Sequence, residues 1–156
     1  MPDAPSGAQR ARRVTRVSAY AVCTDDDGRL LLCRIAPGYT AQHDGWWTLP
    51  GGGLEHGEHP RDGALRELTE ETGLTGEIGD LLDVDSIRAT WTNAAGLDED
   101  YHAIRILYQC RVTGGELRDE LGGSTDTCRW FAPDELRGER LVDIAVAAVR
   151  LRGLGR

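Results

Sequence analysis

Residues 52–74 read Gly-Gly-Leu-Glu-His-Gly-Glu-His-Pro-Arg-Asp-Gly-Ala-Leu-Arg-Glu-Leu-Thr-Glu-Glu-Thr-Gly-Leu. The stretch begins with glycines and continues with a helical pattern, in which Ala64, Leu65 and Leu68 form an apolar stripe. Pro60 suits the first helical turn, and Gly73 fits the position just past the helix end. The stretch therefore predicts a loop followed by a helix that ends at Thr72.

Three carboxylates of the predicted helix lie on one face, because Glu67, Glu70 and Glu71 are related by i, i+3 and i+4 spacings. Like charges at these spacings repel one another unless they are neutralised. A compact cluster of oxygen ligands suits hard cations such as Mg²⁺ or Mn²⁺, which also bridge phosphate oxygens. Arg66 precedes Glu70 by four residues and is placed to balance part of this charge.

The glycine-rich loop before the helix supports the same interpretation. Gly51, Gly52, Gly53 and Gly57 let the backbone approach a metal or a phosphate without obstruction by side chains. Glu58 lies just ahead of the helix, where its carboxylate either caps free amides or joins the metal's surroundings. Taken alone, Arg66 to Glu71 is equally typical of a solvated helix face, so the prediction depends on the whole stretch.

The whole stretch resembles the Nudix box, Gly-x5-Glu-x7-Arg-Glu-U-x-Glu-Glu-x-Gly-U with U aliphatic, at every fixed position from Gly52 to Leu74. Trp47 to Gly53 and Trp130 to Leu136 are also similar to Nudix sequences. The resemblance to MutT-like Nudix hydrolases extends from Val14 to the C-terminus. It implies an α/β/α sandwich with a mixed β-sheet between helices, formed by a single domain over residues 14–156 after a disordered tail over residues 1–13.

The resemblance also implies roles for individual residues. Glu70 and Glu71 are expected as primary metal ligands, Glu67 as a ligand or a water-activating base, and the carbonyl of Gly51 as a further ligand. Arg66 is expected to orient the glutamates, and Glu58 to support the metal site from its edge. With Mg²⁺, or Mn²⁺ in its place, such a site hydrolyses a phosphoanhydride in a nucleoside diphosphate linked to another group, by attack of metal-activated water.

Further candidates for the base and for substrate contacts lie both inside and outside the box. Some family members take their base from an acidic residue in a later loop, and here Glu120 is our first choice among the acidic residues of those loops. We expect substrate contacts from Gly52 and Gly53, from Trp91 by stacking on a base, and from Arg34 through a phosphate. The alternative interpretation of Trp91 is packing in the protein, and that of Arg34 is an ion pair with an acidic residue. The same two possibilities, a phosphate contact or an ion pair, apply to Arg88 and Arg105.

Substrate identity remains open among nucleotide sugars, ADP-ribose-like compounds and modified nucleotides, since substrate choice in this family resides outside the box. The alternative function is a sensor domain that binds a nucleotide derivative without cleaving it. Such domains commonly lose box glutamates, whereas Glu58, Glu67, Glu70 and Glu71 are all present. The sequence therefore favours an enzyme.

Composition bounds the rest of the prediction. A chain of 156 residues, 40% of them hydrophobic, suits one globular domain. A net charge of -8 disfavours stable binding of nucleic acid, which needs a basic face. Met1 to Arg13 contains no apolar run, so neither a signal peptide nor a membrane anchor is expected, and we expect a cytoplasmic protein. The resemblance to a family with many dimers, together with the hydrophobic strands, also favours a homodimer.

The four cysteines, Cys23, Cys33, Cys110 and Cys128, lack Cys-x-x-Cys spacing and fall in apolar stretches. We therefore expect buried reduced thiols rather than a zinc site or a disulfide, with Cys23 and Cys33 as cross-strand neighbours.

Strand-like segments flank the predicted helix on both sides. Val17 to Thr24 and Arg29 to Ile35 predict a hairpin around the turn residues Asp25 to Gly28. Further strands are expected at Trp46 to Leu49, Ile78 to Ile87, Ala103 to Val112 and Thr127 to Phe131. A turn at Pro133 to Leu136 and an amphipathic helix over Leu141 to Leu151 complete the chain.

Overall fold

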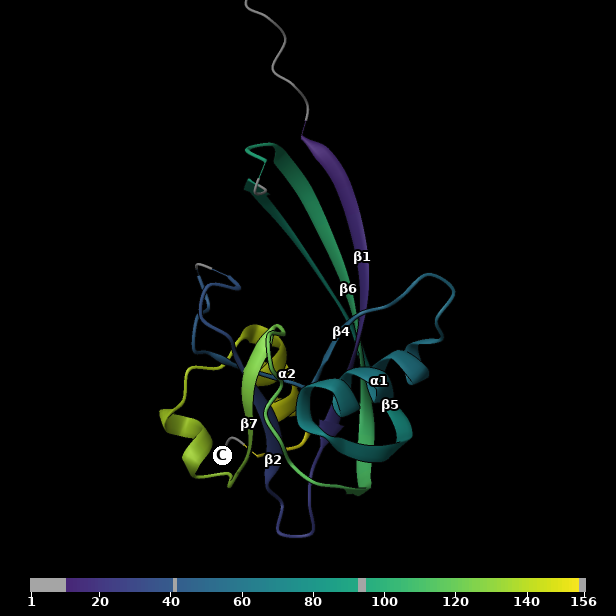
Figure 1. Cartoon of the computed structure of the whole chain (residues 1–156), viewed down its shortest axis with the longest axis vertical. Helices are drawn as coiled ribbons and strands as arrows, with labels where there is room; N and C mark the ends of the chain where they lie inside the picture. Colours follow the sequence, from purple (N-terminus) through teal and green to yellow (C-terminus); the bar gives the residue numbers. More distant parts are fainter. Residues whose placement is uncertain (1–10, 41, 93–94, 155–156) are drawn as a thin grey trace, which may run out of the picture.

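The computed structural model describes residues 11–40, 42–92 and 95–154, which form two β-sheets and two α-helices (Figure 1). One sheet has four strands in the order β4-β1-β6-β5, and the other has three strands in the order β3-β2-β7. The strands of the first sheet are β4 (Gly51–Gly53), β1 (Arg12–Cys23), β6 (Asp98–Gly115) and β5 (Leu74–Thr92). Those of the second are β3 (Trp47–Thr48), β2 (Leu30–Ile35) and β7 (Thr125–Phe131).

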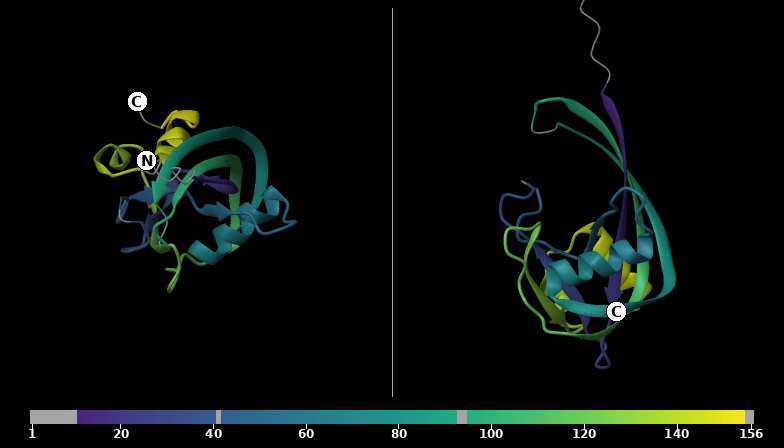
Figure 2. Two further views of the ribbon diagram at one scale, coloured as in Figure 1. Left: turned by 90° about the horizontal axis from the view of Figure 1, so that it is seen from above. Right: turned by 45° about the vertical axis from the view of Figure 1, so that its right-hand side comes forward.

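The four-stranded sheet is mixed, because β1 runs parallel to β6 and antiparallel to β4, while β5 and β6 are antiparallel. Strands β1, β5 and β6 are long and continue beyond the rest of the molecule as an arm (Figures 1 and 2). β1 begins at Arg12, inside the segment expected to be a tail, and pairs there with Glu99 of β6. Residues 1–10 of that expected tail lie outside the described residues.

The two helices are α1 (Pro60–Thr72) and α2 (Asp143–Leu151), and a short 3-10 helix, η1 (Glu135–Gly138), precedes α2. Among the described residues, no helix is long and apolar enough to cross a membrane. The alternation of side chains along β1 shows that the helices cover opposite faces. Ala21 packs in a cluster with Leu68 of α1, whereas its neighbour Val22 packs with Ile144 of α2. This arrangement is the α/β/α sandwich predicted from the sequence.

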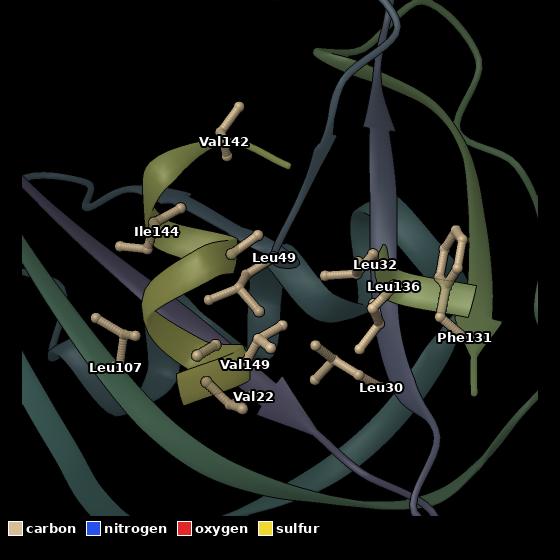
Figure 3. Packing of buried hydrophobic residues seen from close by; sticks show 12 residues of the cluster. Val22, Leu30, Leu32, Leu49, Leu107, Phe131, Leu136, Val142, Ile144 and Val149 are labelled. Carbon is tan, nitrogen blue, oxygen red and sulfur yellow. The ribbon is translucent and has the colours of Figure 1, made fainter. Parts of the chain in front are cut away.

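The larger core cluster lies under α2 and joins both sheets (Figure 3). Leu30 and Leu32 of β2 and Phe131 of β7 meet Val22 and Leu107 of the four-stranded sheet there, and all five side chains are fully buried. Burial of side chains this large contributes ~1.5–3 kcal/mol each, so this cluster is a major part of what holds the two sheets together.

The prediction that the first two strands pair with each other as a hairpin is wrong, because β1 and β2 belong to different sheets. The turn forms as expected, with the Gly28 amide donating to the Asp25 carbonyl at 3.0 Å. Beyond one isolated bridge between Thr24 and Leu30, however, β1 and β2 diverge into different sheets. The reason is that each strand finds longer-range partners, β6 for β1 and β7 for β2, which bury more apolar surface than a two-stranded ribbon.

Cysteine pairing also differs from expectation. Cys33 of β2 lies opposite Cys128 of β7, and the two are joined by a disulfide across 95 residues of sequence. Cys23 lies opposite Cys110 rather than Cys33, and both of these are buried free thiols. The expectation of four reduced thiols is therefore wrong for one pair, because the register of β2 against β7 depends on contacts between segments far apart in the chain.

Candidate active site

Helix α1 positions the glutamates of the box. It begins at Pro60, after His59, whose ring accepts a hydrogen bond from the Arg61 amide at 3.2 Å. It ends at Gly73, which adopts the left-handed conformation with φ 73°. The helix packs on β1 and β4, so one end of its acidic face meets the glycine loop.

Glu71 is the most deeply buried of these glutamates, with 2% of its surface exposed. The Gly51 amide donates to its Oε2 at 3.0 Å, and the Ser124 hydroxyl approaches Oε1 at 3.4 Å. Burial raises the pKa of Glu71 well above its usual range, and the neighbouring charges of Glu67 and Glu120 raise it further. A carboxylate held in this way gains much from a cation beside it.

Arg66 organises the other carboxylates of the box. Its Nε and Nη2 donate to the two oxygens of Glu58 at 2.7 and 3.0 Å, and its Nη1 donates to Glu67 and Glu70 at 3.0 and 3.1 Å. Its Nη2 also reaches the Gly53 carbonyl at 3.2 Å. The Arg66 hydrogen bonds lower the pKa of Glu58 to about 2. Arg66 thus donates hydrogen bonds to three carboxylates of the box, and its role in orienting them for catalysis stays a prediction.

Glu67 and Glu120 complete the acidic group. Glu67 is half-buried, and burial raises its pKa. A Cβ on Gly52 would lie 2.7 Å from the Glu67 carboxylate, so a glycine there leaves room for this side chain. Glu120 accepts a hydrogen bond from the Thr125 hydroxyl at 3.1 Å, and its charge acts on both Glu67 and Glu71. The structure therefore brings Glu120, which lies in a distant loop, to the acidic face of the box.

The chemistry of these donors fits a hard divalent cation. Within the described residues, no group of three or more His, Cys, Asp and Glu side chains converges as a ready cation site. Arg66 instead neutralises Glu67 and Glu70, which would otherwise repel. The buried oxygen atoms of Glu71 and the neighbouring Glu67 nevertheless supply the all-oxygen donors that Mg²⁺ and Mn²⁺ prefer.

A pocket of about 330 Å³ opens beside these glutamates. Its floor is one face of the four-stranded sheet, to which every second residue of a strand contributes. This floor consists of Arg16, Ser18, Tyr20, Ile87, Tyr101, Ala103 and Arg105. The opposite wall comes from β2, β3, β7 and nearby loops, and includes Ile35, Tyr39, Thr40, Thr48, Ser124 and Thr125. Gly51, Gly52, Gly53, Glu67 and Glu71 line the end where the box lies. The pocket is therefore framed by both sheets and by α1.

Arg105 contributes a buried positive charge to the pocket floor, with 7% of its surface exposed. Asp143 of α2 accepts from its two terminal nitrogens at 2.8 and 3.0 Å, and Asp85 of β5 accepts from Nη2. Its charge is thus balanced by two carboxylates of this chain. The structure therefore supports the interpretation of Arg105 as an ion-paired residue.

Arg34 and Trp91 are placed differently from the glutamates of the box. The Arg34 guanidinium donates to both oxygens of Asp126, each at 2.9 Å, and does not line the pocket. The backbone of Trp91 pairs with Glu99 in the arm, and its side chain lies outside the described part of the structure. Neither contact with substrate is tested by the fold.

Sequence reasoning missed the contribution of β1 to the pocket. Arg16, Ser18 and Tyr20 alternate with Val17 and Ala19, so a signal with a period of two was present. Strand β1 could not be recognised as a pocket wall because its parallel pairing with β6 is not encoded locally. Burial raises the pKa of Tyr20, and the charges of Arg105 and Arg16 oppose that rise, so both arginines lie near it.

The chain matches the family described as NUDIX domain over residues 14–150. It is 33% identical over 136 residues to a MutT-like protein of Streptomyces ambofaciens, covering 86% of this chain and 73% of that protein. It is 32% identical over 132 residues to the nucleoside triphosphatase NudI of Escherichia coli, covering 83% of this chain and 91% of that protein.

Solved structures agree with these relatives. A MutT NUDIX hydrolase from Burkholderia pseudomallei superposes with a TM-score of 0.68 at 28% identity, over 88% of this chain and 98% of that one. A NUDIX hydrolase from Nitrosomonas europaea superposes with a TM-score of 0.69 at 25% identity, over 91% and 90% of the two chains. Together with the complete box and its buried Glu71, these matches identify the chain as a member of the Nudix hydrolase family.

Proposed function

We propose that this protein is a divalent-metal-dependent pyrophosphohydrolase that cleaves a phosphoanhydride in a nucleoside diphosphate linked to another group. The observation that carries the proposal is the buried Glu71 carboxylate, held by the Gly51 amide at the end of a pocket large enough for part of a nucleotide. Burying a charge without a partner is costly, so such a carboxylate is best explained by a cation that it binds.

The residues of the chain divide the chemistry between them. Glu67, Glu70 and Glu71, with the Gly51 carbonyl, would hold the cation, and Arg66 and Glu58 keep the glutamates in place. Mg²⁺, or Mn²⁺ in its place, would supply the charge that neutralises the diphosphate and lowers the pKa of a bound water. The glycine loop gives room to the Glu67 carboxylate at Gly52 and to the Arg16 guanidinium at Gly53, and its backbone lines the pocket in which the phosphates would lie.

Glu120 is our proposed general base. Its carboxylate acts electrostatically on Glu67 and Glu71 and lies beside Thr125, a residue of the pocket wall. A base in this position can accept the proton of a water that attacks from the open side of the pocket. Glu120→Gln should then lower kcat while leaving the affinity for the metal nearly unchanged.

The substrate class includes nucleotide sugars, ADP-ribose-like compounds and modified nucleotides. The likeness to a nucleoside triphosphatase adds nucleoside triphosphates to the set, since these are nucleoside diphosphates linked to a further phosphate. We also propose that the protein acts in the cytoplasm as a homodimer, which light scattering of the purified protein and cell fractionation would test.

The first experiment measures release of nucleoside monophosphate from a panel of these compounds, with Mg²⁺, with Mn²⁺ and with a chelator. We expect cleavage of at least one class only when a divalent metal is present. Binding of nucleotides without cleavage across the panel would instead favour a sensor, and cleavage that persists in chelator would refute the metal-dependent site.

A further inference from the structure

Arg16 differs from the other arginines near the active site because, among the described residues, no carboxylate pairs with it. Arg66 is paired with Glu58, Glu67 and Glu70, Arg34 with Asp126, and Arg105 with Asp85 and Asp143. Within residues 11–40, 42–92 and 95–154, Arg16 forms no ion pair and no side-chain hydrogen bond with any protein group. It is nevertheless a residue of the pocket floor, in the same cavity as Glu67 and Glu71.

The guanidinium of Arg16 lies against the backbone of Gly53. A Cβ on Gly53 would lie 2.5 Å from Nη2, 2.6 Å from Nε and 2.9 Å from Cζ of Arg16, and its three closest neighbours would all be atoms of this one group. The backbone of Gly53 does not need the left-handed conformation. Glycine at position 53 is therefore explained by the space that it gives to the Arg16 side chain.

The register of the sheet fixes this contact. Gly53 of β4 pairs with Ser18 of β1. Arg16 precedes Ser18 by two residues, so the two side chains lie on the same face of the sheet. The opposite edge of Gly53 is occupied, because its carbonyl accepts from Arg66. Gly53 thus lies between two arginines. Arg66 is paired with the box glutamates, whereas Arg16 lines the pocket and its donors have no protein partner among the described residues.

We propose that Arg16 is a substrate-binding residue that binds a phosphate group of the substrate, and that Gly53 provides the platform on which its guanidinium is positioned. The inference rests on the proposed function, since the ligand is the phosphate chain cleaved at the same site. A planar guanidinium with free donors is suited to two phosphate oxygens at once. In an acidic chain of net charge -8, an unpaired cation beside the carboxylates also offsets the repulsion that an anionic substrate meets.

The phosphate that Arg16 binds is either one of the two beside the cleaved bond or a third phosphate, and substrates with and without a third phosphate distinguish the two cases. If Arg16 binds one of the two phosphates that flank the cleaved bond, its loss affects nucleoside triphosphates and nucleotide sugars alike. If it binds a third phosphate, its loss affects the triphosphate alone. Either outcome supports a phosphate-binding residue, and the comparison decides which phosphate it is.

The test compares Arg16→Ala and Arg16→Lys with the control Arg12→Ala, which removes the same charge from the same face of the same strand outside the pocket. A charge-assisted hydrogen bond of ~1.5–3 kcal/mol predicts that Arg16→Ala lowers kcat/KM by ~10- to 100-fold, mainly through KM. Arg16→Lys should recover part of the loss, and Arg12→Ala should match the wild type. Equal values for Arg16→Ala and Arg12→Ala on every substrate would overturn the inference.

The substitution Gly53→Ala provides an independent test. Its methyl group meets only the end of a flexible side chain, so the protein should fold while the guanidinium is pushed aside. We expect a rise in KM in the wild-type background and little further change in the Arg16→Ala background. Fully additive effects of the two substitutions would contradict the platform role.

Binding of inorganic diphosphate in the presence of Mg²⁺, measured by calorimetry, separates this inference from the proposed function. A wild-type protein that cleaves no compound of the panel but binds diphosphate at least ~10-fold more tightly than Arg16→Ala would refute catalysis and retain the phosphate-binding role. Equal binding by the two proteins, or no binding by either, would overturn that role.

Discussion

At the scale of single residues, the site depends on carboxylates whose surroundings differ although their sequence spacing is regular. Glu71 is buried against the Gly51 amide, whereas Glu70 is exposed and accepts a hydrogen bond from Arg66. Burial makes the ionised form of Glu71 costly in the absence of a cation. The burial of this carboxylate therefore costs the fold stability when no cation lies beside it.

Glu71→Gln separates activity from stability. The amide keeps the size of the side chain and can still accept from Gly51, but it removes the charge, so we expect turnover to fall at least ~100-fold. The melting temperature in chelator should stay equal or rise, since a buried charge is lost. Steady-state kinetics and thermal unfolding measure the two effects, and Glu116→Gln, at an exposed position, is the control. Unchanged turnover would sink the assignment of Glu71.

The ion pair of Arg34 and Asp126 predicts a pH effect on stability. Arg34 lowers the pKa of Asp126, so the pair stabilises the fold above the usual pKa of an aspartate and loses this contribution as the pH falls through the lowered value. The side chains of Arg34 and Asp126 are 42% and 30% exposed, which limits the effect to ~1 kcal/mol or less.

Urea unfolding of the wild type and Asp126→Asn at pH 7 and near pH 3 measures this contribution. We expect the wild type to be the more stable protein at pH 7, and the difference to shrink near pH 3. A difference that grows on acidification would show that the sign is wrong.

At the scale of elements, helix α1 and its glycine end were predicted from the sequence and form as predicted. Pro60 starts the helix and Gly73 ends it, with the Gly73 amide donating to the Thr69 carbonyl at 2.9 Å. These signals are local, because they depend on backbone conformation within one turn. The packing around Gly73 is not local, since a Cβ there would lie 2.5 Å from the carbonyl oxygen of Glu116.

Gly73→Ala and Gly57→Ala test these two contributions. Both glycines have positive φ, 73° and 80°, but a Cβ on Gly57 meets no atom within 4 Å. Gly57→Ala should therefore cost only the strain of the left-handed conformation, ~1–2 kcal/mol. Gly73→Ala should lower the free energy of unfolding by more than this, because the Glu116 backbone cannot move aside cheaply. Equal losses in denaturant unfolding would contradict the packing argument.

At the scale of the whole molecule, the active site is a product of both sheets. The long strands of one sheet form the pocket floor, β2 and β7 of the other help to form the opposite wall, and the Figure 3 core fixes the two together. The Cys33–Cys128 disulfide adds a covalent link between β2 and β7, and the Cys128 sulfur lies 3.3 Å from the Glu71 carbonyl. Stability of this sheet therefore affects the wall beside the catalytic helix.

Thiol titration checks the cysteine pairing. Unfolded protein that has not been reduced should react at two thiols, Cys23 and Cys110, and reduced protein should react at four. Because the link closes a loop spanning 95 positions, reduction should lower the free energy of unfolding by ~2–4 kcal/mol. Four reactive thiols before reduction would restore the expectation drawn from the sequence.

The sequence by itself determined the family, the box helix and the glutamates, because a helix of period 3.6 brings residues at i, i+3 and i+4 to one face without help from the rest of the chain. Only the tertiary structure decided how the strands divide into two sheets, that Cys33 meets Cys128, that Arg34 is held by Asp126, and that Arg16 lies on Gly53. Each of these contacts joins residues tens of positions apart. Such contacts follow from strand order and register, which the burial of the whole core selects and no local pattern encodes.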